Sequence, residues 1–326
     1  RFIIYMLQVF FLGKNKIFKV RGRSIVMSVV EKSFYKGEVI VKEGDIGDSF
    51  FRLLEGKASV YADWDKKDQE PFRIALLETG EYFGEMAIID SYPRNATIVA
   101  VGNVRVIAIP KDELTTYFQE NPDQILELMQ HLGRRVQAMT NYYNEAKALL
   151  KEVREAEAAK KKSLFSRIKK HVDMYESNKD YITPPSAEAI NEAFEAITDE
   201  GTGDIQNYDT NTIIYEEGAV ENTMYILRNG AVGMYNSNGE KISELKPVSL
   251  FGELGMLASE KREATAVSES DDTYVETITP EYLEPIFLSC PVKIELILKQ
   301  LSYRLRVLNI DVINTCKEIT ETYNKK

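Results

Sequence analysis

The chain has 326 residues, of which 44% are hydrophobic, and this is enough for two ordinary globular domains with a core each. The net charge of −10 and the pI near 5.1 argue against a dedicated nucleic-acid-binding protein, which usually presents a basic surface. The two cysteines lie far apart, which does not indicate a disulfide framework and favours a reducing cytoplasm. The two histidines have no second ligand at metal-binding spacing, so we expect no metal site.

Residues 1–26 differ from the rest of the chain. The apolar run RFIIYMLQVFFL is too short to span a bilayer, and it precedes the basic residues, which is the reverse of a signal peptide. Gly22-Arg23-Ser24 can be encoded by a purine run of the kind that bacterial ribosomes bind shortly before a start codon, and Met27 follows. We therefore expect 1–26 to be an untranslated leader or a disordered N-terminus of a bacterial protein.

Two pairs of similar stretches indicate an internal duplication. The first pair is VIVKEGDIGDSFFRLLEGKASVY (39–61) and IIYEEGAVENTMYILRNGAVGMY (213–235), and the second is FGEMAIIDSYPRNATIVA (83–100) and FGELGMLASEKREATAVS (251–268). These stretches are rich in Val, Ile, Tyr and Phe and are separated by glycines, which is typical of short strands in a small β-roll or barrel. Each half continues with strand-like residues, 104–109 and 273–278, then a proline and a helical pattern.

Each helical pattern carries apolar residues at alternating spacings of four and three. The first seam is Ile125, Met129, Leu132, Val136, Met139, Tyr143, Ala146, Leu150 and Val153, and the second is Ile294, Leu298, Leu301, Leu305, Leu308, Val312 and Ile319. A helix that only covers its own domain needs a wide apolar stripe over two or three turns, and that remains the alternative. The long narrow seam favours a coiled-coil contact, either inside one chain as an intramolecular pseudo-dimer or between chains as a homodimer.

Residues 154–204 predict a charged helical linker between domain A, 27–153, and domain B, 205–326. Its basic run, Lys160–Lys170, suits contact with nucleic acid or an anionic membrane, or else forms a solvated helix face. No stretch is long and apolar enough to predict a membrane span.

The repeated cassette combines residue types that suit a phosphorylated sugar. Glycine before a short helix lets backbone N–H groups approach a ligand, and helix N-termini bind phosphate. Arg94 and Arg262 supply a charged fork for phosphate oxygens, and Glu85 and Glu253 can accept a hydrogen bond from a sugar hydroxyl. The alternative is a buried Glu–Arg pair that only holds a turn.

The pattern FGE(M/L)…(P/K)R-x-A-T-x-V resembles the phosphate-binding cassette of cyclic nucleotide-binding domains, as found in bacterial catabolite activators and in regulatory subunits of cyclic-AMP-dependent kinase. The resemblance covers about 27–145 and 205–326, and its β-roll, cassette and trailing helix occur in the expected order twice. It implies an α+β fold of two β-roll, jelly-roll-like domains, each followed by a long heptad-patterned helix.

The resemblance implies two ligand sites. Site A would consist of Gly84, Glu85, Met86, Arg94, Asn95, Ala96 and Thr140, and site B of Gly252, Glu253, Leu254, Arg262, Glu263, Ala264 and Asn309. In each site Gly and Glu would meet the ribose, Arg and nearby amides the phosphate, and the trailing-helix residue the base. Asn95 and Glu263 stand where relatives that prefer cyclic GMP often carry Thr, which favours cyclic AMP. Glu263 also places a like charge beside the phosphate, so we expect site B to be weak, differently selective or silent.

The function implied is a cytoplasmic cyclic-nucleotide sensor that acts on an effector protein and has no output domain of its own. No nucleophile–base pair, phosphate-binding Walker loop or metal-ligand set indicates an enzyme. Two alternatives remain: a transcription regulator without a recognisable helix-turn-helix, from which no specific DNA binding is expected, and a kinase regulatory-type subunit.

Overall fold

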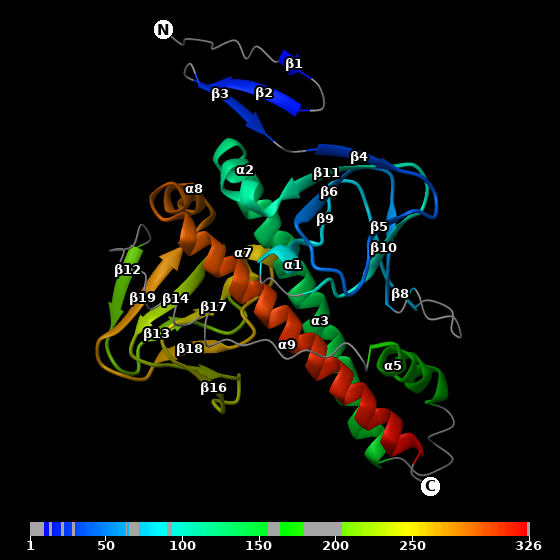
Figure 1. Cartoon of the computed structure of the whole chain (residues 1–326). Helices are drawn as coiled ribbons and strands as arrows, with labels where there is room; N and C mark the ends of the chain where they lie inside the picture. The colour runs from blue at the N-terminus through cyan, green and yellow to red at the C-terminus, as the bar shows by residue number, and fades with distance from the viewer. Residues whose placement is uncertain are drawn as a thin grey trace. The chain divides into compact units, whose positions relative to one another are not determined.

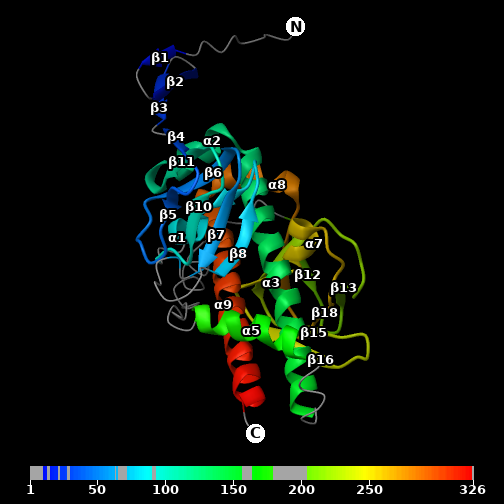
Figure 2. The ribbon, with the colours of Figure 1, turned by 90° about the vertical axis from the view of Figure 1, so that its right-hand side faces the viewer.

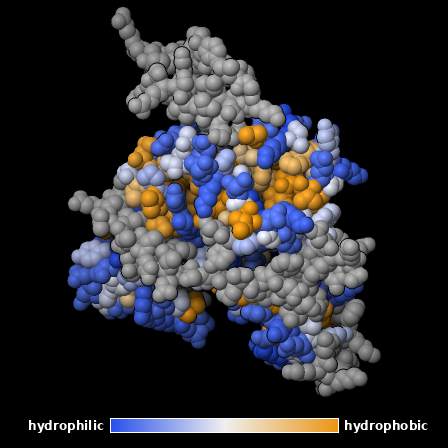
Figure 3. Space-filling model, in the orientation of Figure 1, coloured by the Kyte–Doolittle hydropathy of each residue, from blue (hydrophilic) through white to orange (hydrophobic). Residues whose placement is uncertain are grey.

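The computed structural model describes residues 10–12, 15–20, 23–27, 30–62, 64, 72–89, 93–155, 164–178 and 204–324 (Figure 1). The chain forms two compact units, Arg1–Asn121 and Pro122–Lys326, and each is described by itself. On the face drawn in Figure 3, hydrophilic side chains cover much of the described surface, with groups of hydrophobic side chains between them.

Three strands lie in the segment that the sequence predicts as a leader or a disordered N-terminus. They are β1 (Phe10–Leu12), β2 (Asn15–Val20) and β3 (Arg23–Met27), which pair antiparallel in the order β1-β2-β3. That residues 1–26 are an untranslated leader remains a prediction.

The first unit contains a β-roll built from two four-stranded antiparallel sheets. Their orders are β5-β10-β7-β8 and β4-β11-β6-β9. The strands are β4 (Val30–Phe34), β5 (Val39–Val41), β6 (Ser49–Glu55), β7 (Ala58–Ala62), β8 (Phe72–Leu77), β9 (Tyr82–Phe83), β10 (Thr97–Ala100) and β11 (Val104–Pro110). A short helix, α1 (Glu85–Ile89), separates β9 from β10, and the unit ends with the 3-10 turn η1 (Lys111–Glu113) and α2 (Leu114–Glu120).

Successive side chains of a strand point alternately into and out of this roll, and the inward ones form its core. In β11, Val104, Val106 and Ala108 are buried, whereas Arg105 points outward and pairs with Glu55. The inward residues join a cluster that includes Phe51 and Phe83, whose rings stack with centroids 5.2 Å apart. Burial of each such side chain contributes roughly 1.5–3 kcal/mol to stability.

The second unit contains a roll of the same topology. Its sheets run β12-β19-β14-β17 and β13-β18-β15-β16, so each strand has a counterpart at the same place in the first roll. The strands are β12 (Asp204–Tyr208), β13 (Ile213–Tyr215), β14 (Met224–Asn229), β15 (Val232–Tyr235), β16 (Lys241–Leu245), β17 (Ser249–Phe251), β18 (Thr265–Ser268) and β19 (Thr273–Ile278). The helix α7 (Glu253–Ala258) matches α1, and the predicted pair of β-roll domains is confirmed.

Two long helices also belong to the second unit, α3 (Asp123–Glu155) and α9 (Pro291–Asn324), and α8 (Pro280–Ser289) precedes α9. Prolines begin α8 and α9, where a missing N–H costs no helical hydrogen bond. Figures 1 and 2 show α3 and α9 side by side and in the same direction. Most seam residues are buried, including Val136 and Leu305, while Met139, Tyr143 and Leu308 are half-buried.

A third helix, α5 (Phe165–Asn178), packs against α9 and lies within the predicted linker. Leu164 and Ile168 contribute to an apolar cluster with Leu149, Val153 and Ile319. The linker residues 156–163 and 179–203 lie outside the described residues, and so does the beginning of the basic run, 160–163. Within the described residues, no helix is both long enough and apolar enough to span a membrane.

Candidate ligand sites

The first cassette begins where β9 ends. Gly84 has φ 74°, a conformation that favours glycine, and a Cβ there would lie 2.6 Å from Nη1 of Arg94. Directly after it, α1 runs from Glu85 to Ile89 with all five residues buried, including Met86. A glycine is therefore required both by the turn and by the close approach of the arginine.

Arg94 is held against this turn by backbone oxygens. It is only 7% exposed, and its two terminal nitrogens donate to the carbonyl oxygens of Gly84 and Ser49. The Arg94 backbone N–H donates to Asp45 O at 2.9 Å, and the Gly44 N–H donates to Arg94 O at 2.9 Å. The guanidinium is thus fixed in place by neutral acceptors rather than by an ion pair.

The positive charge of Arg94 has no close ion-pair partner among the described residues. Burial lowers the pKa of Arg94 from its ordinary value, whereas the charges of Glu85, Asp48 and Asp45 act to raise it. Among the described residues no carboxylate oxygen lies within 4.0 Å of Arg94. A buried guanidinium of this kind can accept an anion.

Of the other predicted members of site A, Asn95 and Ala96 lie in the first unit and Thr140 lies in the second. Ala96 is buried, and Asn95 is exposed with its amide nitrogen 4.0 Å from the sulfur of Met86. Thr140 belongs to α3 in the second unit, where its hydroxyl donates to Val136 O at 2.9 Å. Its predicted contact with a base remains a prediction.

The second cassette repeats this geometry. Gly252 has φ 66° and precedes α7, and Arg262, 4% exposed, donates through Nη1 to Gly252 O and through Nη2 to Thr223 O at 3.0 Å. Arg262 N–H donates to Ala219 O at 2.9 Å, as Arg94 N–H does to Asp45 O. The predicted site residues Leu254 and Ala264 are buried beside them.

Arg262 in site B makes side-chain contacts that have no counterpart around Arg94 among the described residues. Nη2 of Arg262 lies 3.0 Å from a carboxylate oxygen of Glu221 and donates to the Thr223 hydroxyl at 2.7 Å. The guanidinium carbon lies 4.5 Å from the ring centroid of Tyr215 and 5.4 Å from that of Tyr225, which is cation–π range. Arg262 is therefore neutralised and packed within its own domain.

The predicted ribose acceptor of site B is also paired. Glu253 is buried and forms a salt bridge with Arg304 of α9, whose side chain is partly exposed. Glu263 is exposed, and Asn309 is half-buried on α9. The carboxylate that contacts Arg262 is consequently that of Glu221, and the predicted roles of Glu263 and Asn309 remain predictions.

Sequence reasoning missed five residues that contribute to site B: Glu221, Thr223, Arg304, Tyr215 and Tyr225. The alignment of 39–61 with 213–235 contained part of the signal, because it sets Glu221 opposite Gly47. The sequence pattern of α9 does not identify Arg304 as a site residue, because Arg304 is not one of the apolar seam residues.

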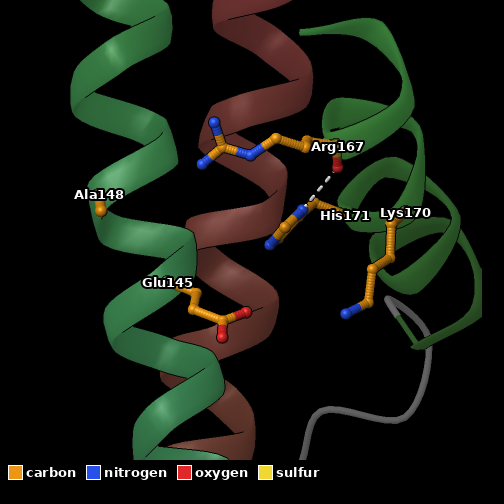
Figure 4. A pocket seen from close by; sticks show the side chains of 5 residues that line it. All are labelled: Glu145, Ala148, Arg167, Lys170 and His171. Atoms are coloured by element: carbon orange, nitrogen blue, oxygen red, sulfur yellow. Dashed lines mark hydrogen bonds between the residues drawn. The ribbon is translucent and has the colours of Figure 1, made fainter.

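Helices α3 and α5 of the second unit line a separate, partly open pocket of about 300 Å³. It is lined by Glu145, Ala148, Arg167, Lys170 and His171, and Figure 4 shows the His171 ring and the Glu145 carboxylate directed into the space between α3 and α5. Nδ1 of His171 bonds Arg167 O at 2.8 Å, and burial lowers the pKa of this imidazole. The pocket contains no cassette residue and is distinct from sites A and B.

No cluster of three or more His, Cys, Asp or Glu side chains suited to a metal ion occurs within the described residues. The sites consist of arginine, glutamate and backbone groups, which suit an anionic, hydroxyl-bearing ligand rather than a cation.

A family model for the cyclic nucleotide-binding domain matches residues 31–121 and 205–289, which together make up more than half of the chain. A cAMP-dependent protein kinase regulatory subunit of Dictyostelium discoideum is 25% identical over 251 residues, covering 75% of this chain and 61% of that protein. A cGMP-dependent protein kinase of Plasmodium berghei (strain Anka) is 35% identical over 129 residues, covering 32% of this chain and 14% of that protein. Across the first five curated relatives the chain spans from 11% to 61% of their length.

Solved structures give a weaker likeness. The regulatory domain of Toxoplasma gondii PKA with cAMP has a TM-score of 0.26 at 15% identity, with 82% of this chain and 86% of that one covered. The Thermus thermophilus catabolite activator protein has a TM-score of 0.26 at 24% identity, with 40% and 64% covered. At these scores the likeness adds no argument of its own.

Proposed function

The chain belongs to the family of cyclic nucleotide-binding domain proteins, and from this premise we propose that it is a cyclic-nucleotide sensor whose working site is site A. Both β-rolls carry the cassette. Glu85 and Arg94 would bind the ligand and would not act as catalytic residues. The ligand phosphate would be held by Arg94 and by the N–H groups of Met86, Asn95 and Ala96, and the ribose by Gly84 and Glu85.

One observation carries this proposal most directly. Arg94 is buried against the turn at Gly84, and among the described residues it has only carbonyl oxygens as hydrogen-bond acceptors. A buried cation without a close counter-ion is costly, so an anionic ligand at this place stabilises the folded domain.

Cyclic AMP is the ligand that we propose, because Asn95 follows Arg94 in place of the Thr that often marks a preference for cyclic GMP. Because one of the relatives is a cGMP-dependent protein kinase, the binding of cyclic AMP and of cyclic GMP must be compared. We propose a cytoplasmic location and an effector protein as partner.

Signalling would use the trailing helices. Within the second unit, α3 packs against both α9 and the cassette helix α7, and Gly133 of α3 faces Leu257 of α7 closely. A ligand-dependent shift of α3 would thereby reach the second cassette. A ligand that binds one arrangement tenfold better shifts the equilibrium by about 1.4 kcal/mol.

A kinase regulatory-type role is the second candidate. It is supported by the match to a cAMP-dependent protein kinase regulatory subunit over 75% of this chain. In that case the effector is a protein kinase catalytic chain, and release of the kinase by cyclic AMP is the discriminating assay.

Thermal unfolding with cyclic AMP, cyclic GMP and cyclic CMP tests the proposal. A ligand at a hundred times its dissociation constant adds about 2.7 kcal/mol to the free energy of unfolding. The largest shift is expected with cyclic AMP, and Arg94→Ala should remove it. If no cyclic nucleotide shifts the wild-type transition, the sensor function is wrong.

A further inference from the structure

The two cassettes hold their arginines with equivalent hydrogen bonds to carbonyl oxygens but differ in the side chains that face the arginine. Arg94 and Arg262 each donate to the carbonyl of the cassette glycine and to the carbonyl of Ser49 or Thr223. The alignment of 39–61 with 213–235 makes Ser49 and Thr223 equivalent. Each guanidinium is therefore held by equivalent carbonyl oxygens of its own roll.

At the aligned position two residues earlier, the first roll has Gly47 and the second has Glu221. The Gly47 backbone approaches the guanidinium of Arg94 so closely that a Cβ there would lie 2.2 Å from Cζ, and this turn therefore places no side chain against Arg94. In the second roll, the aligned residue does carry a side chain, and the Glu221 carboxylate lies 3.0 Å from Nη2 of Arg262.

The carboxylate of Glu221 is held by a closed ring of hydrogen bonds. Arg262 donates to the Thr223 hydroxyl at 2.7 Å, Thr223 donates to the Tyr225 hydroxyl at 3.1 Å, and Tyr225 donates to Glu221 at 3.2 Å. Arg262 closes the ring by its own bond to Glu221. Although the Glu221 side chain is 38% exposed, its oxygen is oriented by two donors from the buried side of the site.

A carboxylate and a cyclic phosphodiester are both singly charged acceptors for a guanidinium, so they compete for it. The Arg262 side chain is only 1% exposed, which leaves little surface for a second anion while Glu221 remains in place. A phosphate that approached without displacing Glu221 would meet a like charge. The salt bridge between Glu253 and Arg304 engages the ribose acceptor of the same site.

We propose that Glu221 is an internal substitute for the ligand phosphate at Arg262, and that it makes site B bind cyclic nucleotide more weakly than site A. This inference rests on the proposed function of site A. It replaces the predicted influence of Glu263, which is exposed, with a direct contact.

The test measures binding of cyclic AMP and cyclic GMP to the full chain by isothermal titration calorimetry, in an Arg94→Ala background that isolates site B. Glu221→Gln removes the charge and keeps the shape, and Glu221→Gly reproduces the side chain of the first roll. Glu216→Gln, an exposed carboxylate on the same turn, is the matched control for net charge. Far-UV circular dichroism and unfolding midpoints establish that each variant is folded.

We expect both Glu221 variants to bind at least tenfold more tightly than their Arg94→Ala parent, with Glu216→Gln unchanged within twofold. Addition of Arg262→Ala should abolish the gain. If the wild type binds, and Arg94→Ala removes that binding, but neither Glu221 variant gains affinity, this inference is overturned while the sensor function stands. If the wild type binds no cyclic nucleotide, both are overturned.

Discussion

Gly133→Ala tests the contact between the trailing helix α3 and the cassette helix α7. In an ordinary helix interior this substitution stabilises by about 1 kcal/mol, because glycine loses more backbone entropy on folding. At Gly133, however, the new Cβ would lie 2.5 Å from the Cβ of Leu257, far inside ordinary van der Waals contact. The contacted atom is the first carbon of a buried leucine, which cannot swing aside without moving the backbone of α7.

Overpacking of this kind costs roughly 1–3 kcal/mol, and the upper part of that range applies because both partners lie on helices. After the gain in helix propensity, Gly133→Ala should lower the free energy of unfolding by up to about 2 kcal/mol. For a unit of this size that is a fall of roughly 4–8 °C in Tm.

Differential scanning calorimetry and urea unfolding provide the assay. Ala138→Gly, on an exposed position of the same helix, reports the propensity difference alone and should cost about 1 kcal/mol. If Gly133→Ala instead raises the stability by about 1 kcal/mol, α3 and α7 are not in close contact and the proposed route between them is wrong.

Three further predictions concern the second unit. Lys293→Met removes a partner from a fully buried ion pair, with Nζ 2.6 Å from Glu276, and should cost about 3 kcal/mol in urea unfolding, since Arg228 still pairs with that carboxylate; a loss below about 1 kcal/mol would contradict the burial of the pair. Leu149→Ala empties a fully buried position between the helices and should cost about 2–5 kcal/mol, whereas an exposed position would give a negligible loss. Burial lowers the pKa of His171 in the folded protein. As the pH falls below about 6.5, His171 therefore takes up a proton in the unfolded chain before it does in the folded one. The stability that the neutral imidazole contributes above that pH is lost as the pH falls through the lowered folded-state pKa. The free energy of unfolding of the wild type relative to His171→Gln should therefore fall between pH 7 and pH 5, and a difference that does not change with pH would contradict this.

Much of the architecture was predictable because it follows from local patterns. The strand-like residues 104–109 form β11, and most residues of the 4-3 seams on the long helices are buried. The Gly-Glu and Arg elements of the cassette were predictable because the left-handed turn at Gly84 and the buried arginine need those residue types.

The charge partners of the sites were not predictable in the same way. Glu263 was expected to act on Arg262 because the two are adjacent in sequence, but Arg262 is buried and Glu263 is exposed. The residue that contacts Arg262 comes from a turn about forty positions earlier, and the partner of Glu253 comes from α9. Such pairings depend on how turns and helices pack, which a single sequence does not specify.

The most direct test of the central claim is a calorimetric titration of the wild type, Arg94→Ala and Arg94→Lys with cyclic AMP. Removal of charge-assisted hydrogen bonds to the phosphate should weaken binding at site A by roughly 10- to 100-fold in Arg94→Ala. Arg94→Lys should recover only part of the loss, because an ammonium cannot reproduce the planar fork. Saturable binding in the wild type that follows this order is the predicted result. Equal affinity of the wild type and Arg94→Ala would contradict the assignment of site A as the phosphate site of the sensor.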